Sequence, residues 1–448
     1  MTTTRRSALL FTSLMACVAN NFSQADTTTA DTSVVENLWS GLRPSGYLKS
    51  YLILQPAQGH ELLQTDTTWL SQSNLRLTWD DAGQWLKTPY AWEVHYELTP
   101  QVSSKVVDTR QRPTADDYRL TDLQPYLASA SQHMTGQNLD RLNVQLQFDH
   151  GDLTLGRQAI AFGSARVISP TDVLLPFNVQ VRNTEYRIGV DALRYQRPLG
   201  QLSVVDVGII AGNDFQSSDS AAFVHIKTHV TDYDLEFTAL RFANQSLIGA
   251  GLQTALGPAG FWFETAVVSG IDHYWRTSTG VDYALTDHLL GLVEYHYNGA
   301  GANTPEDYAS LLTRPAYVQG GVFLVGQQYV MPALSWQVSP LLTVAVQTIL
   351  NLTDHSAFMT LQMDYNLTDN IYLGFGVHGF SGESFVALPP ALHETGAETG
   401  AEAGPGSGAE SGGQPGTEMP NQASTGSSLG SEYGSVPNNV FVSFSVYF

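Results

Sequence analysis

Arginines are concentrated between residues 157 and 187. Four arginines and one aspartate stand out there: Arg157, Arg166, Asp172, Arg182 and Arg187. The same segment is rich in large apolar residues, which are unfavourable in an exposed loop. We therefore expect it to fold inward, where its guanidinium and carboxylate groups would narrow a water-filled passage and select solutes by charge. The alternative is that the segment only packs against a wall and that its arginines pair with acids there.

Such a passage needs a wall with a polar inner face. In the segment 288–298, Glu294 and His296 alternate with Val293, Tyr295 and Tyr297. Alternate residues of a strand lie on opposite faces. A charge on a lipid face costs about 2–4 kcal/mol at mid-membrane, so the polar set must face water. The residues predicted in this way to line a lumen are Gln145, Lys227, Glu236, Glu264, Arg276, Asp282, Glu294 and Asp364.

The same alternation recurs along the chain and predicts an all-β fold, a transmembrane antiparallel β-barrel of about 18 strands, or 16 if a faint N-terminal hairpin fails. Most strands are about ten to twelve residues long, which suits a tilted strand in a bilayer. The predicted strands are 47–55, 74–80, 91–99, 141–149, 152–156, 186–196, 202–212, 221–230, 231–241, 246–255, 260–269, 274–285, 288–298, 328–338, 341–350, 357–367, 370–380 and 438–448.

The connections between these strands sort by length. Turns such as 256–259 and 368–369 are short and carry Gly, Pro or polar residues, and they alternate with longer connections. An even number of strands puts both ends of the barrel on the periplasmic side, so the short turns are predicted there. The long segments predicted outside the cell are 102–140, 157–185, 299–327 and 381–437.

The last strand carries a second signal. Val442, Phe444, Val446 and Phe448 share one face, and hydroxyl-bearing residues occupy the other, with Phe441 out of step. A strand of this kind that ends in phenylalanine resembles the terminal strand of bacterial outer-membrane barrels, which the barrel-assembly machinery recognises. The alternative is an ordinary amphipathic edge strand.

The N-terminus reads as an export signal. Arg5 and Arg6 precede an apolar run, and small residues stand before Asp26, which predicts a signal peptide at 1–25 and a periplasmic segment at 26–46 ahead of a barrel domain at 47–448. Cys17 also fits a lipobox and would then be acylated. The pair Arg5 and Arg6 permits a twin-arginine reading, although a folded export substrate could not afterwards be inserted as strands.

Composition excludes several classes of protein. Hydrophobic residues make up 43% of the chain and the mean hydropathy is −0.11, and no apolar run approaches the length of a membrane-spanning helix. The only cysteine lies in the predicted signal, so neither disulfides nor cysteine metal sites are expected in the mature chain. There are 21 Lys and Arg against 42 Asp and Glu, which argues against nucleic acid as a partner. We expect no cofactor.

The segment 391–434 differs from the rest of the chain. It is rich in Gly, Ser, Ala and Glu and has few large apolar residues, so it cannot bury enough surface to offset its chain entropy. It is predicted to be a disordered acidic extracellular loop within the barrel domain. It would be either an acidic gate or cation-binding fringe, or a tolerated insertion.

Several runs of residues resemble predicted outer-membrane porins related to the alginate-export barrels. They are 140–142, 155–163, 169–173, 189–194, 339–343 and 351–356. The resemblance covers roughly 141–380 and implies a barrel of about 18 strands that passively passes a hydrophilic solute or polymer. Because acidic residues outnumber basic ones, neutral or cationic solutes are expected rather than a polyuronate, with weak cation preference or little selectivity.

The predicted function is therefore that of an integral channel of the bacterial outer membrane and not of an enzyme. A surface adhesin or structural barrel is the alternative, and an outer-membrane hydrolase using His378 and Ser381 is a weaker one. The expected partners are outer-membrane lipid and lipopolysaccharide, the barrel-assembly machinery, and a small hydrophilic solute or polysaccharide. The sequence leaves monomer and trimer both open.

Overall fold

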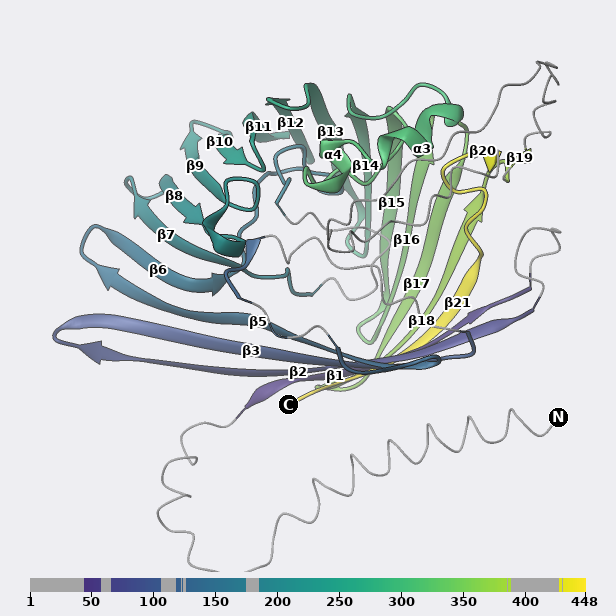
Figure 1. Cartoon of the computed structure of the whole chain (residues 1–448), viewed down its shortest axis with the longest axis horizontal. Coiled ribbons are helices and arrows are strands. Elements are labelled where there is room, and N and C mark those ends of the chain that lie inside the picture. Colours follow the sequence, from purple (N-terminus) through teal and green to yellow (C-terminus); the bar gives the residue numbers. More distant parts are fainter. Residues whose placement is uncertain are drawn as a thin grey trace, which may run out of the picture. The chain divides into compact units, whose positions relative to one another are not determined.

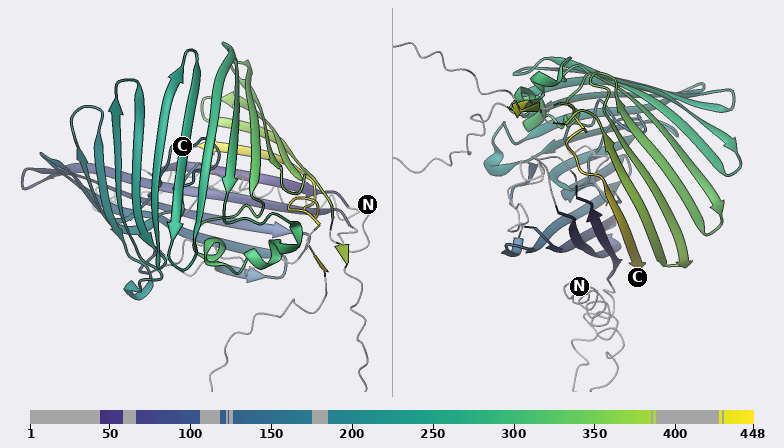
Figure 2. Two further views of the ribbon diagram at one scale, coloured as in Figure 1. Left: turned by 90° about the horizontal axis from the view of Figure 1, so that it is seen from above. Right: turned by 90° about the vertical axis from the view of Figure 1, so that its right-hand side faces the viewer.

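The computed structural model describes residues 44–57, 66–105, 118–121, 123, 126–174, 185–384, 386–387, 427–428 and 430–448. Within these residues, antiparallel strands run side by side around a central space, and the wall of β1–β5 lies across that space from the wall of β9–β14 (Figures 1 and 2). β1 pairs with β2 on one edge and with β21 on the other, which joins the first strand to the last. The sheet is therefore closed, and no strand edge of the ring is left open.

The closed ring has eighteen strands, since the sheet contains nineteen and β4 is a side hairpin that pairs only with β5. The ring comprises β1 (Ser45–Gln55), β2 (Thr68–Trp85), β3 (Thr88–Ser103), β5 (His133–Phe148), β6 (Gly151–Gln158), β7 (Val190–Pro198), β8 (Val204–Ile210), β9 (Ala221–Val230), β10 (Tyr233–Phe242), β11 (Gln245–Leu256), β12 (Ala259–Ser269), β13 (Tyr274–Thr286), β14 (Leu289–Asn298), β15 (Gln328–Ser339), β16 (Leu342–Asn351), β17 (Ala357–Thr368), β18 (Ile371–Ser381) and β21 (Asn439–Tyr447).

The prediction of an eighteen-stranded antiparallel barrel is confirmed, and every predicted strand corresponds to one strand of the ring. The bounds differ most near the N-terminus, where β2, β3 and β5 are longer than expected. The predicted long loop at 102–140 is correspondingly shorter, because β5 begins at His133 and β4 (Tyr126–Ala130) pairs with its first residues. The extra residues of β5 are mostly polar and lack the apolar alternation from which strands can be read.

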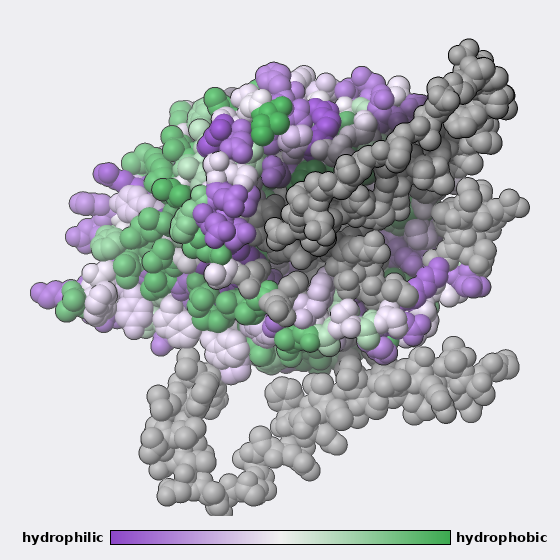
Figure 3. All heavy atoms as spheres, in the orientation of Figure 1, coloured by the Kyte–Doolittle hydropathy of each residue, from purple (hydrophilic) through white to green (hydrophobic). Residues whose placement is uncertain are grey.

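The outer surface is apolar along the strands. On β9, Val224 and Val230 are 44% and 52% exposed, whereas Phe223 and His225, on the opposite face, are buried. Figure 3 shows hydrophobic residues gathered over the outside of the strands and hydrophilic residues at their ends. None of the helices in the described part of the chain is long and apolar enough to cross a membrane.

The last strand follows the predicted alternation. Val442 and Phe448 are exposed on the outer face, and Phe444 and Val446, half-buried, share that face with them. Phe441, the residue out of step in the sequence, lies on the inner face, where it is buried against Tyr51 and Ile53.

Among the described residues, the connections at the end of the barrel opposite Gly46 and Phe448 hold short helical elements and one small hairpin. They include η2 (Asn213–Phe215), η3 (Pro305–Asp307), α3 (Tyr308–Leu311) and α4 (Pro315–Val318), and a two-residue hairpin of β19 (Val386–Ala387) and β20 (Ser427–Ser428). The predicted signal peptide, the segment 26–43 and most of the loop 391–434 lie outside the described residues.

Candidate functional site: a polar cavity beside an anchored inner loop

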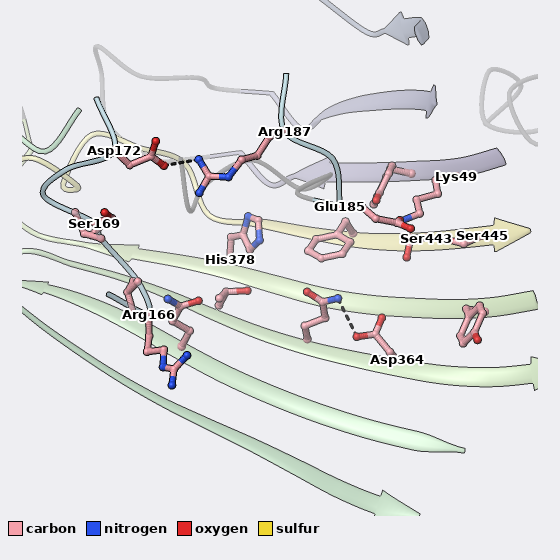
Figure 4. A pocket seen from close by; sticks show the side chains of 18 of the residues that line it. Lys49, Arg166, Ser169, Asp172, Glu185, Arg187, Asp364, His378, Ser443 and Ser445 are labelled. Carbon is pink, nitrogen blue, oxygen red and sulfur yellow. Dashed lines mark hydrogen bonds and ion pairs between the residues drawn. The ribbon is translucent and has the colours of Figure 1, made fainter. Parts of the chain in front are cut away.

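A cavity of about 780 Å³ lies against the inner face of the barrel wall. One side of it consists of β1, β16, β17, β18 and β21, and the other consists of residues 165–172 and 185–187, which follow β6 (Figure 4). Polar side chains make up most of this lining, among them Lys49, Arg166, Asp172, Glu185, Arg187, Gln347, Thr360, Gln362, Asp364, Ser443 and Ser445.

The segment 159–174, termed the inner loop below, is held by Glu264 on β12. The Glu264 carboxylate accepts the backbone N–H groups of Ser164, Ala165 and Thr171 at 2.7–2.9 Å. It also accepts the hydroxyl groups of Ser169 at 2.6 Å and Thr171 at 2.7 Å. Five donors thus converge on one fully buried carboxylate, and hydrogen bonds to a charged acceptor are stronger than neutral ones.

Glu294 on β14 holds the next turn of the same loop. Its carboxylate accepts the backbone N–H groups of Arg166, Val167 and Ile168 at 2.8–3.1 Å, and the indole N–H of Trp262 at 2.8 Å. Like Glu264, Glu294 is fully buried, and among the described residues neither has an ion pair with Lys or Arg. Backbone donors of the inner loop therefore supply much of the stabilisation that a buried carboxylate requires.

The two ends of the inner loop pack into an apolar cluster. Ile160 and Phe162 at one end, and Val173 and Leu174 at the other, join the inward apolar residues of β7–β13. The Phe162 ring meets the Phe223 ring edge-on, with centroids 5.0 Å apart. Gly163 lies in the left-handed region at φ 97°, and a Cβ there would be 1.8 Å from Ser169 Oγ, so only glycine fits this bend.

Three of the five residues predicted to form a constriction line the cavity: Arg166, Asp172 and Arg187. Arg157 does not, because it lies buried in β6 and donates to Asp191 at 2.8 Å and to the Leu139 carbonyl at 2.9 Å. Arg182 lies outside the described residues.

All eight residues predicted to line the lumen lie on inner faces of their strands, but they have different partners. Arg276 and Asp364 border the cavity, and Glu264 and Glu294 bind the inner loop. The other four contact polar groups of the interior. Lys227 pairs with Glu236 at 3.0 Å, Asp282 pairs with Arg166 at 3.6 Å, and Gln145 donates to Asp152 at 3.1 Å.

The charges around the cavity balance. Four basic side chains line it (Lys49, Arg166, Arg187 and Arg276), and so do four acidic ones (Asp172, Glu185, Asp364 and Asp369). Lys49 pairs with Glu185, Arg187 with Asp172, and Arg166 with Asp282. Most arginines of the segment 157–187 that the structure describes therefore pair with acidic residues, as the alternative interpretation of this segment expects.

Among the cavity-lining groups outside the strands, Asp172 has the most strongly shifted pKa. It is almost fully buried, and burial raises its pKa from the usual 3.8 to about 6, although the neighbouring Arg187 opposes the rise. At neutral pH Asp172 is therefore ionised and paired with Arg187. Below about pH 6 it takes up a proton and leaves the guanidinium uncompensated.

Sequence reasoning missed the contribution of β1 and β21. Lys49 approaches the rings of Tyr47 and Tyr447 at 4.8 and 5.4 Å, and Ser443 and Ser445 face the same cavity. The alternation on the last strand already placed both serines on the polar face. What could not be read is that the first and last strands pair, with Lys49 opposite Ser445.

The end of the segment 391–434 is packed at the mouth of the barrel. Glu432 accepts hydrogen bonds from the Tyr329 hydroxyl at 2.6 Å and from the Asn351 amide at 2.8 Å, and its own N–H donates to Asp354. Burial raises the pKa of Glu432 to about 7. The predicted disorder of the segment therefore does not extend to residues 430–434, and residues 391–426 lie outside the described part.

The candidate hydrolase residues do not form a recognisable site. His378 lies between the rings of Phe358 and Phe441, with centroids 5.4 and 5.2 Å away, and Ser381 ends β18. The described residues also contain no group of three or more His, Cys, Asp or Glu that could hold a metal ion.

Among solved structures, a triple mutant of the Rhodopseudomonas blastica porin is similar over 91% of this chain and 100% of that chain, with 10% identity and a TM-score of 0.43. OccAB4 of Acinetobacter baumannii is similar over 90% of this chain and 98% of that chain, with 10% identity and a TM-score of 0.49. No protein-family model matches the sequence, and no curated protein matches it. Values this low identify neither a family nor a solute, and the relation to alginate-export barrels remains a prediction.

Proposed function

We propose that this protein is a channel of the bacterial outer membrane through which small hydrophilic solutes diffuse. The observation that carries the proposal is a polar cavity inside a closed eighteen-stranded barrel with an apolar outer face. An apolar exterior suits lipid, and a barrel of this size has a lumen too wide for wall side chains alone to fill. The inner loop narrows that lumen from one side.

The charge balance of the cavity supports weak ionic selectivity. Four basic and four acidic groups line it, and most of them are paired, so an ion of either sign meets little net charge there. The acidic surplus of the whole chain then favours a slight cation preference. A strong preference for anions in a salt gradient would contradict this.

Planar-bilayer recording on the refolded full-length mature chain tests the channel function. Discrete conductance steps are expected, together with swelling of liposomes in sugar solutions. Ser443→Trp should lower the conductance, because Ser443 faces the cavity. Val442→Trp, one residue away on the exposed outer face, is the matched control and should leave the conductance unchanged.

A folded barrel that gives neither conductance nor swelling would overturn the channel function and favour an adhesin or structural role. Equal effects of the two tryptophans would show that the cavity is not the path of the ions.

A further inference from the structure

We propose that the cavity wall formed by β16, β17 and β21 is a binding strip for neutral polyhydroxylated solutes, that is, for sugars and polyols. This inference rests on the proposed channel function and specifies the solute class. Most charged groups of the cavity are already paired, whereas several of its neutral polar groups have no hydrogen-bond partner among the residues that the structure describes.

The neutral groups form one continuous patch. Gln347 on β16 stands directly opposite Thr360 on β17, and Gln362 lies two residues further along the same face. Across β18 the patch continues to Ser443 and Ser445 on β21. Gly374 lies between Asp364 and Ser443 in the register, so no side chain separates the two halves of the patch.

The shape of the wall depends on that glycine and on its neighbour Gly376. A Cβ on Gly374 would lie 2.2 Å from Ser443 Oγ, and a Cβ on Gly376 would lie 2.2 Å from the Phe441 ring. The Ser443 hydroxyl therefore lies over Gly374, and the Phe441 ring lies over Gly376. A side chain at Gly374 would displace the Ser443 hydroxyl from its place in the patch, and one at Gly376 would displace the Phe441 ring.

The side chains of Gln347, Thr360, Ser443 and Ser445 make no hydrogen bond to any other group in the described part of the chain, yet all four face the cavity. Water must therefore satisfy them in the resting protein. Each amide or hydroxyl can both donate and accept, which is also true of each sugar hydroxyl. A polyhydroxylated solute could replace these waters group for group.

The charged groups offer less to an ionic solute. Lys49 is bound to Glu185, Arg187 to Asp172, and the Asp364 carboxylate accepts from Gln362 at 2.9 Å. At Lys49 or Arg187 a solute carboxylate would have to displace an existing acid. Arg276 has no ion pair among the described residues, but it is only 2% exposed and so is hardly accessible to a solute. Two half-buried rings beside the strip, Tyr372 and Tyr447, give apolar surface for the C–H face of a sugar ring.

The size of the space fits the same solute class. A cavity of about 780 Å³ falls within the range of about 300–1,000 Å³ typical of small-molecule sites. It would hold a short oligosaccharide, and a longer polymer would have to thread through it.

The test is the block of ion current by sugars in planar bilayers. Maltotriose is the neutral probe, and trigalacturonate is an acidic probe of matched size. Wild-type channels should show concentration-dependent block by maltotriose and weaker block by trigalacturonate. The double variant Gln347→Leu and Thr360→Val should weaken maltotriose binding by about two- to tenfold for each hydrogen bond lost. Ser443→Ala with Ser445→Ala should act in the same direction.

Gln253→Leu is the matched control, because Gln253 lies on the inner face of β11 outside the cavity lining. It should leave the maltotriose block unchanged, and the β-sheet circular-dichroism spectrum of each variant shows whether its barrel is folded. The binding strip would be overturned by a conducting wild type without maltotriose block or by tighter block with trigalacturonate. Equal losses of maltotriose block in Gln253→Leu and in the double variant Gln347→Leu with Thr360→Val would overturn it as well. A wild type that does not conduct would instead overturn the channel function.

Discussion

Two sides of the barrel interior differ in what lies against their inner faces. On the side of β7–β14, Glu264 and Glu294 accept the backbone of the inner loop, and apolar residues of the wall pack against its ends. On the side of β16–β18 and β21, the inner faces carry amides and hydroxyls, and a cavity remains in front of them. We call these the anchored side and the open side.

The difference teaches that alternation alone does not decide whether an inner face is packed into a core or lines a cavity. Both sides alternate in the same way, with apolar residues outward. On the anchored side, buried carboxylates face backbone N–H groups of the inner loop that have no partner within the loop itself. The carboxylates and the N–H groups must pair with one another, because an unpaired polar group is costly to bury. The open side presents groups that water can satisfy, so nothing has to cover them.

The largest expected effect comes from releasing the inner loop. In the double variant Glu264→Gln and Glu294→Gln, each amide presents a donor to groups that are themselves donors, and charge-assisted bonds worth about 1.5–3 kcal/mol each are lost. The loop should leave the wall, and single-channel conductance should rise several-fold with larger current noise. Glu236→Gln, an inner-wall carboxylate that pairs with Lys227 on the neighbouring strand, is the control.

A reversible tether sharpens that experiment. A Cβ on Gly251 would lie 2.8 Å from Ser164 Oγ, so Gly251→Cys with Ser164→Cys should form a disulfide that ties the inner loop to β11. Added to the double glutamine variant, the oxidised pair should restore the wild-type conductance, and reduction should abolish the rescue. If the double glutamine variant conducts like the wild type, the two glutamates do not position the loop.

A smaller effect is expected from packing on the anchored side. Phe162→Ala removes a buried ring that contacts Phe223, and truncations of this kind cost about 3–5 kcal/mol. Thr360→Ala on the open side should change stability by no more than about 0.5 kcal/mol, because its hydroxyl makes no hydrogen bond to another described residue. Urea unfolding in detergent micelles measures both. Similar losses for the two variants would remove the distinction between the sides.

The smallest effect concerns Asp172, which lies where the two sides meet. Its folded pKa of about 6 exceeds the usual 3.8, so its protonation favours the folded state, and that contribution is lost as the pH rises from about 4 through 6. Protonation below about pH 6 also leaves Arg187 uncompensated in the cavity. Reversal potentials should therefore shift toward anions between pH 7 and pH 5.

Asp172→Asn is the control for this prediction. It should show the low-pH selectivity of the wild type at both pH values, because the asparagine cannot be ionised. A wild type whose reversal potential is the same at pH 7 and pH 5 would contradict the assignment.

Much of the fold could be predicted because strand alternation is a local property. Eighteen strands, their polar inner faces and the apolar outer face of the last strand all follow from residues two positions apart. The apolar content of the segment after β6 likewise indicated that this loop avoids water. β5 was predicted too short because its first half carries no apolar alternation, and its pairing with β3 depends on a distant strand.

The sequence by itself determined that the chain forms a barrel wall with a polar interior, and it singled out Arg166, Asp172 and Arg187, which line the cavity. Only the tertiary structure decided that Arg157 belongs to the wall, that Glu264 and Glu294 bind the inner loop instead of the solvent, and that Lys49 meets Ser445. The physical reason is that a charge in the sequence shows that a partner is needed but not which one. Charged partners such as Lys49 and Glu185 lie 136 residues apart in the sequence, and closure of the barrel selects them.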